Sequence, residues 1–144
     1  MPAGWGDPVA EIPPLVADLI GERNFAHLAT IGPDGGPSSW PIWVDVEEDR
    51  VIFVTQLGSR KSDDIERDPR VALSIAHRED PYRQADLRGR VVERFDGDAA
   101  LVLADRIARK YTGEPFPIRG EATVIYAIEV LEARHQKLPF TDEG

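Results

Sequence analysis

Residues 83–95 constrain the fold of this chain more than any other segment. This segment is long enough to form one long strand, but Gly89 interrupts its apolar positions Leu87, Val91 and Val92. A glycine inside a strand weakens it locally and commonly marks a bulge or a sharp bend. Because a sheet with such a bend curves, we predict a small closed or split β-barrel in preference to a flat sheet.

Shorter apolar runs predict five further strands. Two of them flank Gly-Pro-Asp-Gly-Gly, a dense turn signal, and are therefore expected to form a hairpin. A third is rich in β-branched and aromatic residues and should be buried on both faces. The last alternates apolar residues at period two. The five segments are residues 25–31, 38–46, 51–55, 71–75 and 122–131.

Three segments predict helices. Residues 15–20 are short and amphipathic, and a longer helix with apolar residues at helical spacing starts at Asp96 and stops at Gly113. A brief helix follows residue 62 and ends before Pro69, because proline disfavours the helical conformation in the residue before it. The predicted fold class is therefore mainly β or α+β, a barrel with two or three flanking helices.

The size of the chain suits a single domain over residues 1–144. With 144 residues, of which 42% are hydrophobic, it can bury one core and is too short for two. The ends, residues 1–8 and 138–144, are expected to be loose tails unless a partner subunit covers them.

Charge and composition narrow the function. A formal net charge of -9 repels nucleic acid and anionic lipid, so neither is an expected partner. The absence of cysteine removes thiolate chemistry, and the three histidines lack metal-ligand spacing, so no metal site is expected. The N-terminal stretch has neither the basic start nor the apolar core of a signal peptide, and we expect a cytoplasmic protein.

A pentad, residues 58–62 with the sequence Gly-Ser-Arg-Lys-Ser, stands where a predicted strand passes into a helix. Arg60 can give phosphate a two-pronged hydrogen bond, and Lys61 adds a compact charge. Ser59 or Ser62 can donate from a hydroxyl, and the helix presents free amides. The alternative is that both cations are solvated and pair with the carboxylates that follow. Those carboxylates, expected to form a solvated helix face, are Asp63, Asp64, Glu66 and Asp68.

The run VIFVTQLGSRKSDDIERDPRV, residues 51–71, resembles the flavin-phosphate segment of the pyridoxamine 5′-phosphate oxidase family. The likeness extends more weakly over residues 25–95. It implies a split β-barrel that acts as a homodimer, with two cofactors bound at the subunit interface. Two later segments, Asp-Pro-Tyr-Arg at residues 80–83 and Lys-Tyr-Thr-Gly at residues 110–113, are similar to small actinobacterial oxidoreductases that use the deazaflavin coenzyme F-420. F-420 is therefore the favoured cofactor, and FMN the other.

The resemblance also implies the cofactor-binding residues. Arg60 and Lys61 would hold the phosphate, with Thr55 near it, and Gln84 would reach the ring from a neighbouring strand. The full set of expected cofactor-binding residues is Ser39, Trp40, Pro41, Ile42, Trp43, Val44, Thr55, Ser59, Arg60, Lys61 and Gln84. Trp40 and Trp43 are three apart and should point to opposite faces. A polyanionic cofactor tail could meet Arg109, Lys110 and Arg119.

The expected function is hydride transfer from the bound cofactor to a small conjugated or unsaturated acceptor, with no catalytic side chain required. Vitamin B6 oxidation is not implied, because the basic residues that flank the ring-lining strand in those oxidases correspond here to Ser39 and Val44. Two alternatives stay open. One is a non-catalytic protein that stores or senses a flavin- or haem-type ligand on the same barrel, and the other is a structural dimer with a dead site.

Overall fold

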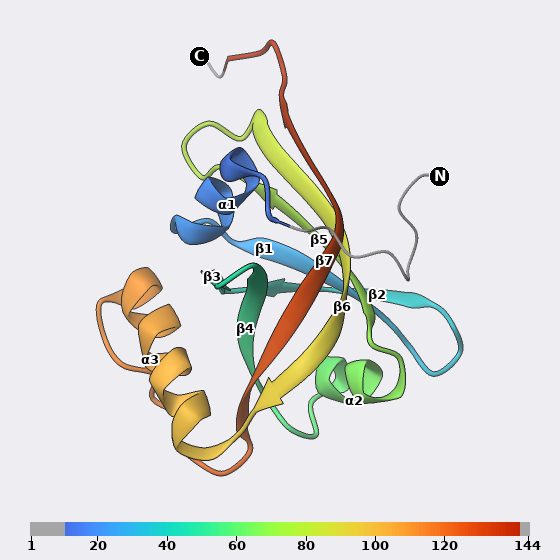
Figure 1. Cartoon of the computed structure of the whole chain (residues 1–144), viewed down its shortest axis with the longest axis vertical. Helices are drawn as coiled ribbons and strands as arrows, with labels where there is room; N and C mark the ends of the chain where they lie inside the picture. Colours follow the sequence, from blue (N-terminus) through green and yellow to red (C-terminus); the bar gives the residue numbers. More distant parts are fainter. Residues whose placement is uncertain (1–10, 142–144) are drawn as a thin grey trace.

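The structure is a computed structural model that describes residues 11–141. Within that range, a seven-stranded antiparallel sheet curls into a half-barrel, and three helices flank it (Figure 1). The predicted split barrel with flanking helices is confirmed. The helices are α1 Pro14–Gly21, α2 Arg60–Arg67 and α3 Gly97–Thr112, and the strands are β1 Ala26–Ile31, β2 Pro37–Ile42, β3 Val44–Glu47, β4 Arg50–Gln56, β5 Arg70–Ala76, β6 Arg83–Phe95 and β7 Thr123–Lys137.

The sheet has the strand order β2-β1-β5-β6-β7-β4-β3. Only Trp43 separates β2 from β3 in the sequence, yet these strands form the two opposite edges. The prediction of one strand over residues 38–46 is therefore wrong. An apolar run does not reveal where its hydrogen-bonding partner changes, here from β1 to β4. Because one residue spans at most about 3.6 Å, the sheet must curl until its edges meet.

The bend at Gly89 is present as predicted. The register of β6 against β7 shifts between Arg88 and Gly89 and again between Val91 and Glu93. At the first shift the two backbones approach so closely that a Cβ on Gly89 would lie 2.4 Å from the carbonyl oxygen of Glu129. Only glycine fits there, which explains why this residue interrupts the apolar run.

Two apolar clusters flank the sheet. The barrel cluster lies inside the curl and includes Val51, Phe53 and Tyr126. The helix cluster lies between the sheet and α3 and includes Ile52 and Ile125. β4 and β7 therefore bury both faces, which confirms the prediction for residues 51–55.

The last strand, β7, is longer than predicted. It extends to Lys137, whereas the expected strand ended at residue 131, because its second half is mostly polar and pairs with the first half of β6. Residues 138–141 follow it outside any strand or helix. The rest of the expected C-terminal tail and the expected tail at residues 1–8 lie outside the described residues. No helix between residues 11 and 141 is long and apolar enough to cross a bilayer.

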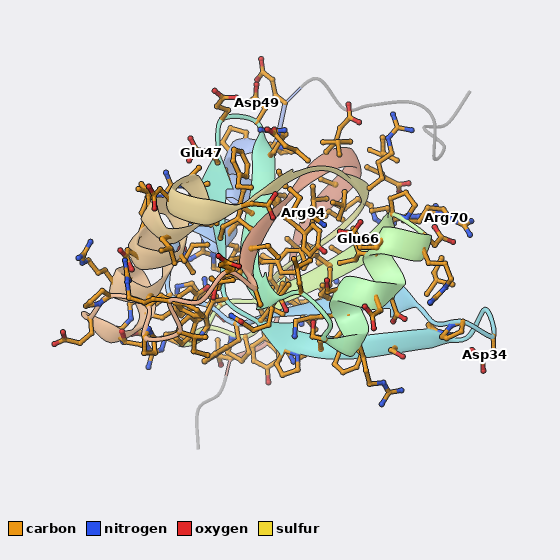
Figure 2. The ribbon with its side chains drawn as sticks, turned by 90° about the horizontal axis from the view of Figure 1, so that it is seen from below. Asp34, Glu47, Asp49, Glu66, Arg70 and Arg94 are labelled. Carbon is orange, nitrogen blue, oxygen red and sulfur yellow. The ribbon has the colours of Figure 1, made fainter. Side chains whose placement is uncertain are left out.

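Three side chains anchor α2 to the sheet. Ile65 is buried in the barrel cluster, and the Ser62 Oγ lies 2.8 Å from the hydroxyl of Tyr126 on β7. Glu66 forms an ion pair of 2.7 Å with Arg94 near the end of β6 (Figure 2). These contacts fix α2 relative to the barrel.

Candidate functional site

The pentad forms the junction between β4 and α2. Gly58 has a φ of 87°, in the left-handed region that glycine adopts freely and other residues rarely occupy. Ser59 is the N-cap of α2, and its Oγ accepts a hydrogen bond of 3.3 Å from the backbone amide of Ser62. This arrangement places Arg60 and Lys61 in the first turn of the helix.

Arg60 and Lys61 do not pair with the neighbouring carboxylates. Among residues 11–141, neither cation has a carboxylate oxygen within the 4.0 Å of an ion pair. The Arg60 Cζ and the Lys61 Nζ each lie 5.7 Å from the centroid of the Trp40 ring, within the range of a cation–π interaction. Burial lowers the pKa of Lys61 from its ordinary value. Over the described part of the chain, the carboxylate pairing of the alternative is therefore absent for both residues, whereas Arg60 is exposed to solvent and Lys61 is half-buried.

The hydroxyl groups around the pentad serve the fold. Thr55 is buried, and its Oγ1 lies 3.2 Å from the Ser59 Oγ. Ser62 is also buried, with its hydroxyl against Tyr126. The groups left for an anion are therefore the two cationic side chains and the backbone amides at the start of α2, which have no partner within the helix. This donor set suits a phosphate.

Asp64 departs from the prediction of a solvated helix face. It is 5% exposed, and its Oδ2 accepts a hydrogen bond of 2.7 Å from the hydroxyl of Thr30. Its Oδ1 accepts one of 2.9 Å from the Arg67 Nη2. The hydrogen bond from Thr30, assisted by Arg67, lowers the pKa of Asp64 despite its burial. Thr30 in turn accepts a hydrogen bond of 3.0 Å from the indole Nε1 of Trp40.

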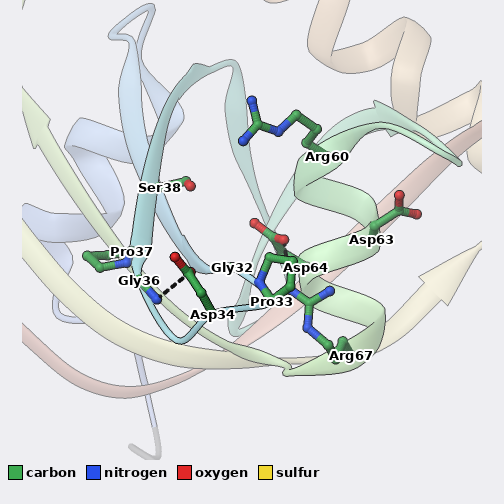
Figure 3. A pocket seen from close by; sticks show the side chains of 10 residues that line it. All are labelled: Gly32, Pro33, Asp34, Gly36, Pro37, Ser38, Arg60, Asp63, Asp64 and Arg67. Atoms are coloured by element: carbon green, nitrogen blue, oxygen red, sulfur yellow. Dashed lines mark hydrogen bonds and ion pairs between the residues drawn. The ribbon is translucent and has the colours of Figure 1, made fainter.

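Two cavities border the pair of cations. The large cavity, about 580 Å³, lies between the β1–β2 turn and α2, and both Arg60 and Asp63 line it. Arg60 extends toward the side of Ser38, whereas the Asp63 side chain points away from Arg60 (Figure 3). The small cavity, about 270 Å³, contains Lys61 and three of the residues expected to line the cofactor ring, Pro41, Ile42 and Trp43. Its lining is Phe25, Pro41, Ile42, Trp43, Val54, Lys61 and Phe116.

Six of the expected cofactor-binding residues line neither of these two cavities: Ser39, Trp40, Val44, Thr55, Ser59 and Gln84. Ser39 is exposed on β2. Val44 is fully buried in the barrel cluster, so its side chain cannot contact a surface ligand. Gln84 lines a third cavity of about 520 Å³ together with Phe25 and His27.

The two tryptophans belong to different clusters, as their spacing predicts. Trp40 packs against the barrel cluster and Trp43 against the helix cluster. Trp43, which lies between strands, stacks on Tyr111 with ring centroids 5.2 Å apart. Trp43 and Phe116 share the small cavity with Lys61.

The basic residues expected to meet a cofactor tail are engaged elsewhere. Lys110 is half-buried and donates to the carbonyl oxygens of Ile20 and Val44, and burial lowers its pKa to about 8. Arg119 forms an ion pair of 2.7 Å with Asp105. That expectation is therefore wrong for these two residues.

The segments that resembled F-420-dependent enzymes hold the fold together. The Tyr111 hydroxyl donates to the carbonyl of Asn24 at 2.6 Å and receives the amide of Val44 at 3.2 Å. Asp80 pairs with Lys137 at 2.5 Å. Both segments therefore also stabilise the fold.

Sequence reasoning missed Thr30, Asp64 and Phe25 as parts of the site. Thr30 had a usable signal, because period-two alternation places it on the same buried face as Ala26 and Leu28. A buried hydroxyl needs a hydrogen-bonding partner. Phe25 had no such signal, since it reaches the small cavity only through the tertiary fold.

A family model described as pyridoxamine 5′-phosphate oxidase matches residues 12–137 of this chain. A pyridoxine/pyridoxamine 5′-phosphate oxidase of Nostoc sp. is 29% identical over 123 residues, which cover 85% of this chain and 56% of that protein. The chain thus spans about half the length of the curated relatives that it matches.

Two solved structures share the fold. An F-420 reductase is 23% identical with a TM-score of 0.75, and the match covers 85% of this chain and 98% of that one. An FMN binding protein of Nostoc punctiforme, related to pyridoxamine 5′-phosphate oxidase, is 15% identical with a TM-score of 0.60, covering 77% and 72%.

Proposed function

The chain belongs to the pyridoxamine 5′-phosphate oxidase family, and from this premise we propose that it is an oxidoreductase with a bound flavin-type cofactor. The favoured cofactor is coenzyme F-420, with FMN as the second candidate, and the substrate is a small conjugated or unsaturated organic acceptor. Either cofactor supplies hydride transfer when bound. One observation carries the proposal: Arg60 and Lys61 lie together on Trp40, and neither forms an ion pair within residues 11–141.

The phosphate of the cofactor would be held by these two cations and by the backbone amides of Arg60 and Lys61 at the start of α2. The chain carries a net charge of -9, so a phosphate gains nothing from the overall field and must be bound locally. Gly58 contributes by turning the backbone so that the helix starts directly at the end of β4. Ser59 caps the helix and keeps its first turn in place.

The ring system would lie against the small cavity, next to Lys61. Pro41, Trp43 and Phe116 supply an apolar wall there, which excludes water from one side of a bound ring. No side chain needs to act as acid, base or nucleophile in this proposal. The role of the protein is to orient the ring and to leave the other side open to the acceptor.

Two observations favour F-420 over FMN. The segments at residues 80–83 and 110–113 resemble F-420-dependent enzymes, and the solved F-420 reductase resembles this chain more than the FMN binding protein does, with TM-scores of 0.75 and 0.60. Vitamin B6 oxidation is not proposed. Val44, which replaces a basic residue of those oxidases, is buried and offers no charge to a substrate.

The proposed active form is a homodimer with the cofactors between subunits. The small cavity, at about 270 Å³, is below the roughly 300–1,000 Å³ of sites that enclose a small ligand. Phe25 at its rim is 58% exposed, which is unusual for a large apolar residue beside a binding site. A second copy that covers Phe25 would both enlarge the site and bury this ring.

The test is a comparison of cofactor affinities. Binding of F-420 and FMN is followed by fluorescence quenching in the wild type and in Arg60→Ala/Lys61→Ala. Removing two charge-assisted contacts should weaken binding about 100-fold or more. A charge-matched control, Arg106→Ala/Arg119→Ala, removes two cations that are held in ion pairs on the α3 side and should bind like the wild type.

Equal affinity of the pentad double variant and the wild type would refute the phosphate site. Turnover then separates enzyme from binding protein. The wild type with reduced cofactor is offered quinones, enones and tetrapyrroles, and oxidation of the cofactor is expected with at least one class. A tightly bound cofactor that none of them oxidises would favour the storage or sensing alternative.

A further inference from the structure

A hydrogen-bonded chain of three side chains connects the cation-bearing face of Trp40 to the buried carboxylate of Asp64. The Trp40 Nε1 donates to the Thr30 Oγ1 at 3.0 Å. Thr30 donates to the Asp64 Oδ2 at 2.7 Å, and Arg67 donates to the Asp64 Oδ1 at 2.9 Å. These residues come from β1, β2 and α2, so the chain crosses the same junction that carries Arg60 and Lys61.

The direction of each hydrogen bond in this chain is fixed by chemistry. An indole N–H can only donate, so the Thr30 oxygen must accept from Trp40, and its single proton must go to Asp64. A guanidinium can only donate as well, so Asp64 receives hydrogen bonds on both of its oxygens. Both oxygens of the Asp64 carboxylate therefore act as acceptors, and this orientation of the Thr30 hydroxyl is the one that satisfies both Trp40 and Asp64.

This arrangement holds the Trp40 ring in one orientation. We propose that Thr30 and Asp64 are positioning residues for the cofactor phosphate: they fix the Trp40 ring, and the ring fixes Arg60 and Lys61. The inference rests on the proposed function, because it requires an anion on these two cations. Long side chains lose conformational freedom when they grip a ligand. A rigid ring 5.7 Å from both cationic groups removes part of that cost in advance.

Positioning and simple electrostatics predict opposite effects at Asp64. Its negative charge lies near Arg60 and acts on it electrostatically, so on charge alone its removal should tighten the binding of an anion. If Asp64 acts through Thr30 and Trp40, its removal should weaken that binding. Asp63 provides the matched comparison, since it carries the same charge on the next residue but is exposed and points away from Arg60 (Figure 3).

The measured quantity is the phosphate preference, the ratio of the dissociation constants of riboflavin and FMN. F-420 and its phosphate-free deazaflavin chromophore form a parallel pair. In each pair the ring is the same, so general damage to the site cancels. Thr30→Val keeps shape and charge but removes both hydrogen bonds, and we expect it to lower the preference about five- to tenfold, the scale of one lost hydrogen bond.

Three further variants complete the set. Asp64→Ala should lower the phosphate preference as Thr30→Val does, whereas Asp63→Ala should leave it unchanged or raise it. Thr30→Ser retains the hydroxyl and should restore the wild-type value. Thr30→Val matches threonine in size and removes the hydroxyl, whereas Thr30→Ser keeps the hydroxyl and removes a methyl group, so the two variants separate the hydrogen bonds from packing even if Asp64→Ala folds poorly.

The results distinguish this inference from the function on which it rests. A phosphate preference that disappears in Arg60→Ala/Lys61→Ala but survives in Thr30→Val would overturn the positioning role alone. Stronger phosphate preference in Asp64→Ala would also overturn it, in favour of electrostatics. A wild type that shows no preference in either pair would overturn the phosphate site and the positioning role together.

Discussion

Replacement of Gly89 by alanine tests the close approach that bends the barrel. The new Cβ would lie 2.4 Å from the carbonyl oxygen of Glu129 and 2.7 Å from the Cγ2 of Ile128, whereas ordinary contacts begin at 3.4 Å. To remove the clash with Glu129, the backbones of β6 and β7 must move apart by 1.0 Å, the difference between 3.4 and 2.4 Å. The atom in the way belongs to the backbone of β7, so a side-chain rotation cannot provide it.

The expected loss of stability follows from these distances. Overpacking against a backbone costs about 3 kcal/mol, the upper part of the usual range. Loss of one β6–β7 hydrogen bond adds about 1 kcal/mol to this cost. The unfolded chain is less flexible with alanine than with glycine, which stabilises the folded state by about 0.7 kcal/mol. The free energy of unfolding should therefore fall by about 3 kcal/mol, equivalent to a decrease of roughly 10 °C in Tm for a chain of this size.

The assay is urea unfolding followed by far-UV circular dichroism, with a thermal melt beside it. Both are repeated at several protein concentrations, because the stability of a dimer depends on concentration. Gly120→Ala is the matched control, since a Cβ there meets no atom within 4 Å and its φ is not positive. If Gly89→Ala and Gly120→Ala agree within about 0.5 kcal/mol, an ordinary surface effect, the steric reasoning is refuted.

Two further predictions concern lysines. Burial lowers the pKa of Lys110 from 10.5 to about 8, so between these pH values the unfolded chain binds more protons than the folded one. The free energy of unfolding should therefore rise with pH over this range, by at most about 3 kcal/mol. Urea titrations at pH 7.5 and 10 should show this rise in the wild type, and an equal rise in Lys110→Met would contradict the prediction. Lys61 also has a lowered pKa because of burial, and a bound phosphate favours its charged form, so cofactor affinity should be full below that pKa and fall as pH rises through it. In Lys61→Arg the affinity should stay constant over the same range, and titrations that show identical profiles for both proteins would exclude Lys61 from the site.

The architecture could be predicted where one segment carries its own signal. Gly89 within an apolar run indicated the bend, and the doubly buried character of β4 followed from residues 51–55. The pentad indicated the strand-to-helix junction, because turn, cap and helix are all local. In each of these cases the signal lies within a short stretch of the sequence, even where the contact itself is distant, as between Gly89 and Glu129.

The remaining features depend on contacts between distant segments. The break at Trp43 cannot be inferred from an apolar run, because it is set by the different partners of β2 and β3. Asp64 looks like one more acidic residue of a solvated helix until Thr30 is placed opposite it. Lys110 looks like a free cation until the carbonyls of Ile20 and Val44 surround it. The sequence therefore indicated which groups could bind an anion more reliably than which of them are available.

The single residue between β2 and β3 has a mechanical consequence. Trp43 connects β2 and β3, the two edge strands of the sheet. Its ring stacks on Tyr111 and also borders the small cavity. Any motion that separates the edge strands β2 and β3 would pull the Trp43 ring away from Tyr111 and deform the wall of the small cavity. A ligand bound against Trp43 would therefore stabilise the closed form of the barrel, and the dissociation rate of that ligand would depend on how readily the barrel opens.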